Sequence, residues 1–273
     1  TPISADNPYS LAINISNLNA HQVQIAIQTT VLYYDSWSLL KCAEQLQNIV
    51  FGVSKSKEEQ ISYLQYLGWK ENLLLDPVDE AIKYWKRVSR SLEEQAYNWV
   101  IPTPNSEART SYGKQNSFQK NLLSTSETSE SSVKDIVRYL WVNLISSYTN
   151  TEDIILFERI SSRVFEQLED TFGAMDEFVP VSMSITQEKE IKEVVLQLKK
   201  NSETAAKYIN YFNSEINQNK SIRSAAFDYG STSIDKVSEC KLERIFESAI
   251  TLQVLEQNGN IKWRIVYDEA SFN

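Results

Sequence analysis

A seven-residue repeat of apolar or small side chains runs from position 191 to position 216. Its members, at alternating steps of four and three, are Ile191, Val195, Leu198, Ser202, Ala205, Ile209, Phe212 and Ile216. Such a repeat keeps one stripe of a helix against a partner. Because other segments carry comparable stripes, we expect this helix to pack within one subunit. The side chains expected to be buried are Val195, Leu198, Ile209 and Phe212.

The chain is poor in glycine. It has 6 glycines in 273 residues, and no two of them are close together, whereas the usual share is about 7%. Few positions can therefore adopt a positive φ, which favours long helices over a many-stranded β fold. The same scarcity excludes a Walker loop, a dinucleotide fingerprint and a serine-nucleophile elbow, because these motifs need closely spaced glycines.

Apolar spacing predicts helices over most of the chain. The expected ranges are about 20–53 (with a break near residue 35), 56–67, 77–100, 132–149, 151–172 and 186–216. Two capping boxes support these starts, one at Ser56 and Glu59 and one at Ser132 and Asp135. Gly68 is expected to end the second helix, since glycine is common just past a helix end.

Two of these helices have a predicted inner face. In the helix from 132 to 149 the side chains expected to point inward are Val133, Val137, Leu140, Leu144 and Tyr148. In the helix from 151 to 172 they are Ile154, Phe157, Ile160, Val164, Leu168 and Phe172.

The end of the chain shows strand alternation instead. Asn258 and Gly259 supply a two-residue turn between two alternating runs. This turn pairs Val254 with Trp263, Leu252 with Ile265, and Ile250 with Tyr267. Residues 179–185 also alternate, with Pro180 interrupting, which indicates an edge strand or an extended lead-in to the next helix. Residues 11–15 alternate over a run too short to decide.

The predicted fold class is therefore mainly α. It is a multi-helix bundle, all-α and coiled-coil-like in character, with a small antiparallel β element that includes a C-terminal hairpin at about 249–256/261–268. The domains expected are an N-terminal helical region (1–101), a polar Ser/Thr/Asn-rich loop or linker (102–131) and a helical region ending in the hairpin (132–273). An alternative joins both helical regions into one continuous domain.

The sequence shows no recognisable set of catalytic residues. The only histidine is His21, so neither a zinc site nor a di-iron site with a histidine pair can be built. Neighbouring carboxylates such as Glu93 and Glu94 point to different sides of a helix and form no acid–base pair. The sequence predicts no catalytic, cofactor-binding or metal-ligating residue and no cofactor.

One basic cluster is a candidate binding site. Its members are Lys83, Lys86, Arg87 and Arg90. They share a helix face, with Tyr84 and Trp85 among them, which suits an anionic partner. The alternative is ordinary surface patterning, because Asp79 and Glu94 lie four residues from members of the cluster. Trp85 also fits the buried stripe of its helix.

The net charge and the hydropathy of the chain limit the classes of partner that it could bind. A net charge of −9 and a pI near 4.9 disfavour nucleic acid, whose affinity for proteins depends on Lys and Arg. A membrane surface could attract the chain only through a local basic patch. No leader or run of 18 apolar residues is visible, which favours a cytoplasmic, soluble protein.

The function expected from these observations is that of a non-enzymatic helical interaction or structural protein acting through protein–protein contacts. Its partner would be another protein or a second copy, and no small-molecule ligand is inferred. A membrane-active, toxin-like helical protein is the alternative, because the chain has amphipathic helices and many aromatic residues. An enzyme without a recognisable motif is the third possibility, so enzymatic activity is left uncertain, leaning no.

Overall fold

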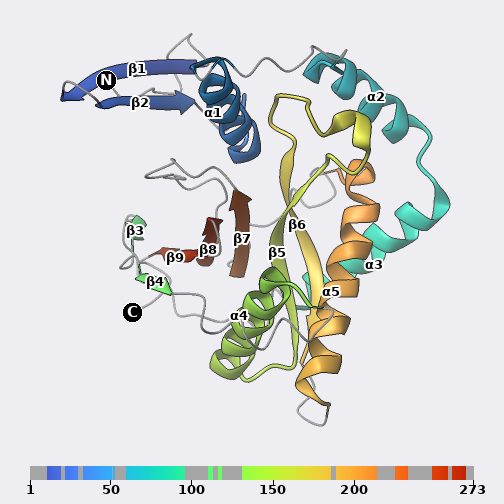
Figure 1. The fold of residues 1–273 in the computed structure, drawn as a ribbon. Helices are drawn as coiled ribbons and strands as arrows, with labels where there is room; N and C mark the ends of the chain where they lie inside the picture. The colour runs from blue at the N-terminus through green and yellow to red at the C-terminus, as the bar shows by residue number, and fades with distance from the viewer. Residues whose placement is uncertain are drawn as a thin grey trace.

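A computed structural model describes most of the chain. The described residues are 11–19, 22–29, 33–50, 52, 60–95, 110–112, 116–118, 131–185, 189–213, 225–232, 248–257 and 260–268. They form a seven-stranded sheet, a separate two-stranded sheet and helices that pack on the larger sheet (Figure 1). The protein is therefore an α/β protein and not the mainly-α bundle that the sequence predicts.

The larger sheet has the strand order β3-β9-β8-β7-β5-β6, with β4 also paired to β9. Its strands are β3 (Thr110–Tyr112), β4 (Asn116–Phe118), β5 (Asp153–Ser161), β6 (Asp176–Ser184), β7 (Ala225–Thr232), β8 (Ile250–Gln257) and β9 (Asn260–Asp268). β7 is parallel to both of its neighbours, β5 and β8, and the other pairs are antiparallel. β6 lies at one edge of this sheet.

Five helices accompany the sheet in the described residues. They are α1 (Ser36–Val50), α2 (Tyr63–Leu75), α3 (Asp79–Gln95), α4 (Val133–Thr149) and α5 (Ile191–Lys207), with short 3-10 turns η2 (Glu166–Leu168) and η3 (Ile209–Tyr211). α4 and α5 lie side by side against β5 and its neighbours, and α3 contacts β5 and β6 (Figure 1). The main core lies between these helices and the strands.

Strand β5 explains why the mainly-α prediction is wrong. Seven consecutive residues, 154–160, are buried. Ile154 and Leu156 join the main core, whereas Ile155 and Phe157 pack with α3 on the other face. A strand buried on both faces shows a continuous apolar run, which periodicity alone does not distinguish from a helix. The predicted helix over 151–172 is therefore a strand followed by a loop and η2.

The seven-residue repeat does form a helix, α5, and its predicted burial is confirmed. Val195 and Phe212 are 5% and 6% exposed, and Leu198 and Ile209 are fully buried. The helix ends at Lys207 and continues as η3. Its surroundings are β6, β5 and α4, so the repeat marks a helix packed on a sheet. The coiled-coil-like description is wrong.

The N-terminal part also differs from the prediction. Residues 22–29 form a strand, β2, which pairs with β1 (Leu11–Asn19), and the helix α1 begins only at Ser36. α2 starts at Tyr63 with a capping box formed by Ser62 and Gln65, and Gly68 lies inside it. The capping box expected at residues 56 and 59 lies outside the described residues.

α4 has the predicted bounds and the predicted capping box at Ser132 and Asp135, but its inner face is wrong. Leu140, Leu144 and Tyr148 are 51%, 54% and 72% exposed. The residues that point inward are instead Asp135, Arg138, Trp141, Val142 and Ile145. The inner face includes the charged side chains of Asp135 and Arg138, so apolar spacing alone does not indicate it.

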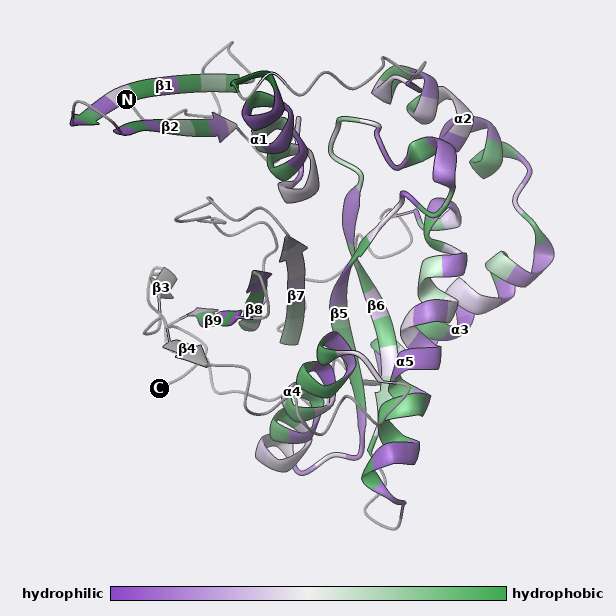
Figure 2. Cartoon of the chain, in the orientation of Figure 1, coloured by the Kyte–Doolittle hydropathy of each residue, from purple (hydrophilic) through white to green (hydrophobic). Residues whose placement is uncertain are grey.

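The β8–β9 hairpin is confirmed in its register: Val254 pairs with Trp263, Leu252 with Ile265 and Ile250 with Tyr267. The edge strand containing Pro180 is confirmed as β6. Figure 2 shows the mixture of hydrophobic and hydrophilic residues along the helices. β3 and β4 come from the segment expected as a linker and pair with β9, and the division into domains stays a prediction.

Candidate functional site

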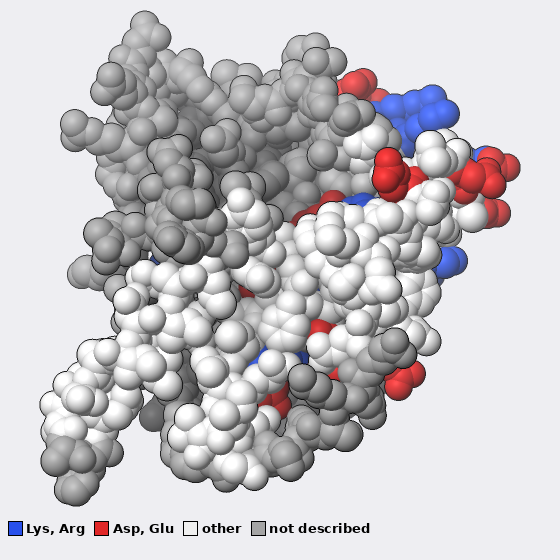
Figure 3. Space-filling model, turned by 90° about the horizontal axis from the view of Figure 1, so that it is seen from above, with Lys and Arg blue, Asp and Glu red and all other residues white. Residues whose placement is uncertain are grey.

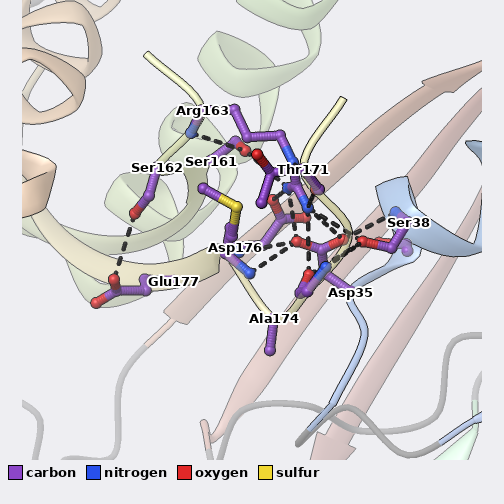
Figure 4. Close-up of polar contacts among 12 residues, drawn as sticks. Asp35, Ser38, Ser161, Ser162, Arg163, Thr171, Ala174, Asp176 and Glu177 are labelled. Carbon is purple, nitrogen blue, oxygen red and sulfur yellow. Dashed lines mark hydrogen bonds and ion pairs between the residues drawn. The ribbon is translucent and has the colours of Figure 1, made fainter. Parts of the chain in front are cut away.

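Five buried charged residues link the first helix to the larger sheet. They are Asp35, Arg159, Arg163, Asp176 and Asp228, and we call them the Asp–Arg cluster. Their side chains are between 1% and 8% exposed. Burial of so much charge is costly unless the groups are paired and hydrogen-bonded, so the contacts of each member are informative. Figure 4 shows Asp35, Arg163 and Asp176 with their partners.

Asp35 caps α1. Its Oδ1 accepts the backbone N–H of Ser38 at 2.9 Å, three residues on, as N-cap carboxylates do. Its Oδ2 accepts the backbone N–H groups of Met175 at 2.9 Å and of Asp176 at 3.1 Å. Arg163 Nη1 donates to the same oxygen at 2.7 Å. One carboxylate therefore joins α1, the start of β6 and the segment after β5.

Arg163 extends this junction. Its Nε and Nη2 donate to the carbonyl of Thr171 at 3.1 and 3.0 Å, and Nη2 also donates to the carbonyl of Gly173 at 3.2 Å. The guanidinium lies over the ring of Trp37, 4.3 Å from its centroid. The cation thus holds the loop between η2 and β6 against the first turn of α1.

A row of polar side chains continues across the sheet. Arg159 Nη1 lies 2.6 Å from Asp176 Oδ2, and Arg159 Nε lies 2.5 Å from Asp228 Oδ1. Asp228 Oδ2 accepts from Gln253 Nε2 at 3.1 Å, and Gln253 Oε1 accepts from Arg264 Nε at 2.6 Å. These residues lie on β5, β6, β7, β8 and β9, so the row ties adjacent strands together.

Two carboxylates of the cluster, Asp35 and Asp176, have pKa values shifted in opposite directions. Burial alone would raise the pKa of Asp35, but the hydrogen bonds and charge of Arg163 outweigh burial and lower it. Burial raises the pKa of Asp176, and the nearby charge of Asp35 adds to this despite Arg159 and Arg163. The cluster holds three carboxylates and two guanidiniums, so Asp176 carries the unfavourable excess of negative charge.

The pairing of these groups suits a positioning role. Each charged member is engaged by another member, a backbone group or the sheet, and none is directed only at solvent. The described residues contain no group of His, Cys, Asp and Glu side chains that could hold a metal ion, and His21 lies outside them. What the cluster does chemically is to fix α1 and the loop before β6 relative to the sheet.

A second buried cluster lies on the opposite face of β5. Glu158, fully buried, accepts from Arg138 Nη2 at 2.8 Å, from Arg138 Nε at 3.1 Å and from Ser202 Oγ at 2.5 Å. Lys134 Nζ lies 3.0 Å from its carboxylate, and Arg138 also donates to Asp135 at 2.7 Å. This Glu158 cluster joins β5, α4 and α5. Burial opposes ionisation of Glu158, but Lys134 and Arg138 outweigh it and lower its pKa.

The structure places the sequence-predicted basic residues elsewhere. Lys83, Lys86, Arg87 and Arg90 are all exposed on α3. Arg87 lies over the ring of Tyr84, while Trp85 is buried and donates its Nε1–H to the carbonyl of Tyr208 at 2.9 Å. The core assignment of Trp85 is confirmed. Binding of an anionic partner by the four cations stays a prediction. The face in Figure 3 shows charged side chains gathered toward one side of the described surface.

Sequence reasoning missed both buried clusters. The available signals were local ones: an aspartate directly before α1, and the Ser132–Asp135 capping box, whose aspartate also binds Arg138. Neither signal identifies the partner, because Asp35 and Arg163 are 128 positions apart.

Gly173 is required where it stands. A Cβ on this residue would lie 2.3 Å from the ring of Tyr63, and its backbone N–H and carbonyl both bond to Ser38 Oγ at 3.0 Å. We expect Gly173→Ala to lower the free energy of unfolding by about 1–3 kcal/mol, as overpacking does, measured by urea denaturation. Gly68→Ala is the control: it meets no atom within 4 Å and should stabilise α2 by about 0.5–1 kcal/mol. Equal effects of the two changes would contradict this account.

The fold is that of condensation-type domains. A condensation domain described as mediating chain release from the enacyloxin polyketide synthase matches with a TM-score of 0.75 and 11% identity, over 97% of this chain and 57% of that one. The condensation domain of the Monacolin K polyketide synthase MokA matches with 0.73 and 10% identity, over 97% and 68%. VibH, a condensation enzyme of nonribosomal peptide synthesis, matches with 0.69 and 13% identity, over 97% and 66%.

These similarities define the fold and correct the functional expectation. The chain spans between 57% and 68% of the three matched structures. No protein-family model and no curated protein matches its sequence. Because structures of this fold are described as condensation and epimerization domains, the expected non-enzymatic helical protein is wrong. The toxin-like alternative is not favoured either, and no described helix has the length and apolar character that crossing a bilayer requires.

Proposed function

We propose that this chain provides part of a condensation-type domain, which transfers an acyl group to a nucleophile during assembly or release of a peptide or polyketide chain. The observation that carries the proposal is the fold match at a TM-score of 0.75 over 97% of the chain. The enzymes of this fold are described as acting in condensation and in chain release.

The Asp–Arg cluster supports the proposal through rigidity. An acyl-transfer site gains much of its rate from holding reactants in a fixed geometry, and the cluster locks α1 and the loop before β6 onto the sheet. It supplies the frame for such a site. The reacting groups are left to the remainder of the domain.

A protein partner is part of the proposal. The X-domain from teicoplanin biosynthesis shares this fold at a TM-score of 0.61 and was solved as a complex with OxyB. Surfaces of this fold can therefore serve protein recognition. The exposed cations of α3 are the candidate site on this chain.

An acyl-transfer assay tests the activity. The native protein from its source cells, which contains residues 1–273 together with the remainder of the domain, would be incubated with an acyl thioester, such as octanoyl-N-acetylcysteamine, and with an amine or an alcohol. The amide or ester would be measured by mass spectrometry. We expect product at a rate at least about tenfold above the uncatalysed reaction, a difference of about 1.4 kcal/mol in activation free energy. Heat-unfolded protein is the control. Neither turnover nor binding of the thioester by ligand-observed NMR would count against the proposal.

A further inference from the structure

Strands β1 and β2 form an arm with one largely apolar face. Among the strands that the structure describes, they pair only with each other, with Ile13 opposite Ile27 and Ile15 opposite Ile25. Because side chains alternate along a strand and opposite residues share a face, one face of the arm carries six aliphatic side chains, with Asn17 and Thr29 at its ends. The six are Leu11, Ile13, Ile15, Val23, Ile25 and Ile27. The other face carries Ala12, Asn14, Ser16, Gln24, Ala26 and Gln28. The arm projects from the body of the molecule (Figure 1).

The apolar face is exposed. Leu11, Ile13 and Ile15 are 36%, 45% and 69% exposed, and Val23 and Ile25 are 56% and 42% exposed. A two-stranded hairpin is marginally stable in water on its own, and a contiguous apolar patch of this kind marks an interaction surface.

The arm also lacks the charged residues that commonly protect a solvent-exposed strand edge. No Asp, Glu, Lys or Arg occurs between Asp6 and Asp35. Strands whose edges face water commonly carry charges that block pairing with other strands. A hairpin with one apolar face, one polar face and no charge has instead the pattern of strands inside an antiparallel sheet that covers a core. The arm is thus built as an interior element.

We propose that the apolar face of the arm packs against a polypeptide segment outside residues 1–273, which supplies the part of the condensation-type fold that this chain does not span. The matched structures align with 96% to 98% of this chain, which leaves too few residues unmatched to omit the arm. About a third or more of each matched chain has no counterpart here. That remainder is the occupant: a segment with an aliphatic sheet or helix face and a free strand edge.

Two other occupants fit less well. Two copies of the chain would each bring a charge of −9 and would repel each other at any interface that brings their bodies close. The arm has no Lys or Arg residue, so it offers no positive charge that an anionic membrane could attract. The inference depends on the shared fold and not on the proposed activity, so failure of the acyl-transfer assay would leave it standing.

Site-specific photo-crosslinking tests the proposal. A benzoylphenylalanine is placed at Ile15, on the apolar face, or at Ser16, on the polar face, in the native protein produced in its source cells, and crosslinked peptides are identified by mass spectrometry. We expect Ile15 to yield crosslinks to one segment outside residues 1–273, and Ser16 to yield few. Crosslinks between two arms, to lipid, or within residues 1–273 would overturn the proposal.

Hydrogen exchange supplies the second readout. Backbone amides of residues 11–29 should exchange at least about tenfold more slowly in the native protein than in the 273-residue chain alone. The double change Ile13→Lys and Ile15→Lys should abolish this protection, whereas Asn14→Lys and Ser16→Lys should retain it. Equal exchange of the arm in both forms would refute the proposal. So would a homodimer of the 273-residue chain, seen by light scattering, that the Ile13→Lys and Ile15→Lys change disrupts.

Discussion

Replacing Arg163 by methionine is expected to lower the free energy of unfolding by about 3–5 kcal/mol, the range seen when one partner of a buried ion pair is removed. The change leaves Asp35, 6% exposed, without its guanidinium. It also removes the donors to the carbonyls of Thr171 and Gly173. Urea denaturation followed by circular dichroism measures the loss.

A double variant separates the unpaired charge from the lost packing. Asp35→Asn keeps a side chain that can still cap α1. Because asparagine is uncharged, no unpaired buried charge remains when Arg163 is also replaced. We therefore expect Asp35→Asn with Arg163→Met to be more stable than the sum of the single changes predicts, by about 0.5–3 kcal/mol, the range for residues in one network. Arg90→Met, an exposed control on α3, should stay within about 0.5 kcal/mol. Strict additivity would show that the pair is not coupled.

The features that the sequence predicted correctly depend on contacts between residues close together in the chain. The cap formed by Ser132 and Asp135 lies within three residues. The register of β8 and β9 follows from the expectation of a two-residue turn between two strands that are consecutive in the chain. Both predictions were right because the interacting residues are neighbours in sequence or are linked by one turn. The seven-residue repeat similarly identified the buried side of α5, although not what covers it.

What could not be predicted depends on contacts distant in sequence. The apolar run of β5 is compatible with a helix or a doubly covered strand, and only the helices on both of its faces decide between them. On α4 the buried face includes Arg138, whose partner Glu158 belongs to β5. Apolar spacing therefore favoured the opposite side, which the structure exposes.

The same distinction holds for the sites. The cations of α3 could be found because all four belong to one helix and recur at helical spacing. The Asp–Arg cluster could not be found, since its five members come from β5, β6, β7, the residue before α1 and the segment after β5. A single sequence contains no signal that joins Asp35 to Arg163 across the fold.

Arg138→Met is the second change with a large expected effect. Of the partners that the described residues supply, it leaves Glu158, which is fully buried, with Lys134 and Ser202. We expect the free energy of unfolding at pH 7 to fall by about 3–5 kcal/mol, because a buried carboxylate without its guanidinium is strongly destabilising. Glu158→Gln with Arg138→Met should recover part of the loss, since the carboxylate of Glu158 is then no longer a buried charge without its guanidinium, while Asp135 still lacks its own. Recovery of nothing would indicate that the loss is one of packing alone.

The pH dependence of that loss tests its electrostatic origin. In the parent protein burial opposes ionisation of Glu158, but Lys134 and Arg138 outweigh it and lower its pKa below the 4.5 of an ordinary glutamate. The stability from its ionisation is therefore fully present above pH 4.5 and is lost as the pH falls toward the lowered value. In Arg138→Met the charge and the hydrogen bonds of Arg138 no longer act, so the pKa of Glu158 is higher than in the parent protein. The variant therefore loses less stability than the parent on acidification. The difference between the two proteins, measured by urea denaturation at several pH values, should therefore shrink as the pH falls. A difference that stays constant with pH would assign the effect to lost packing of the Arg138 side chain.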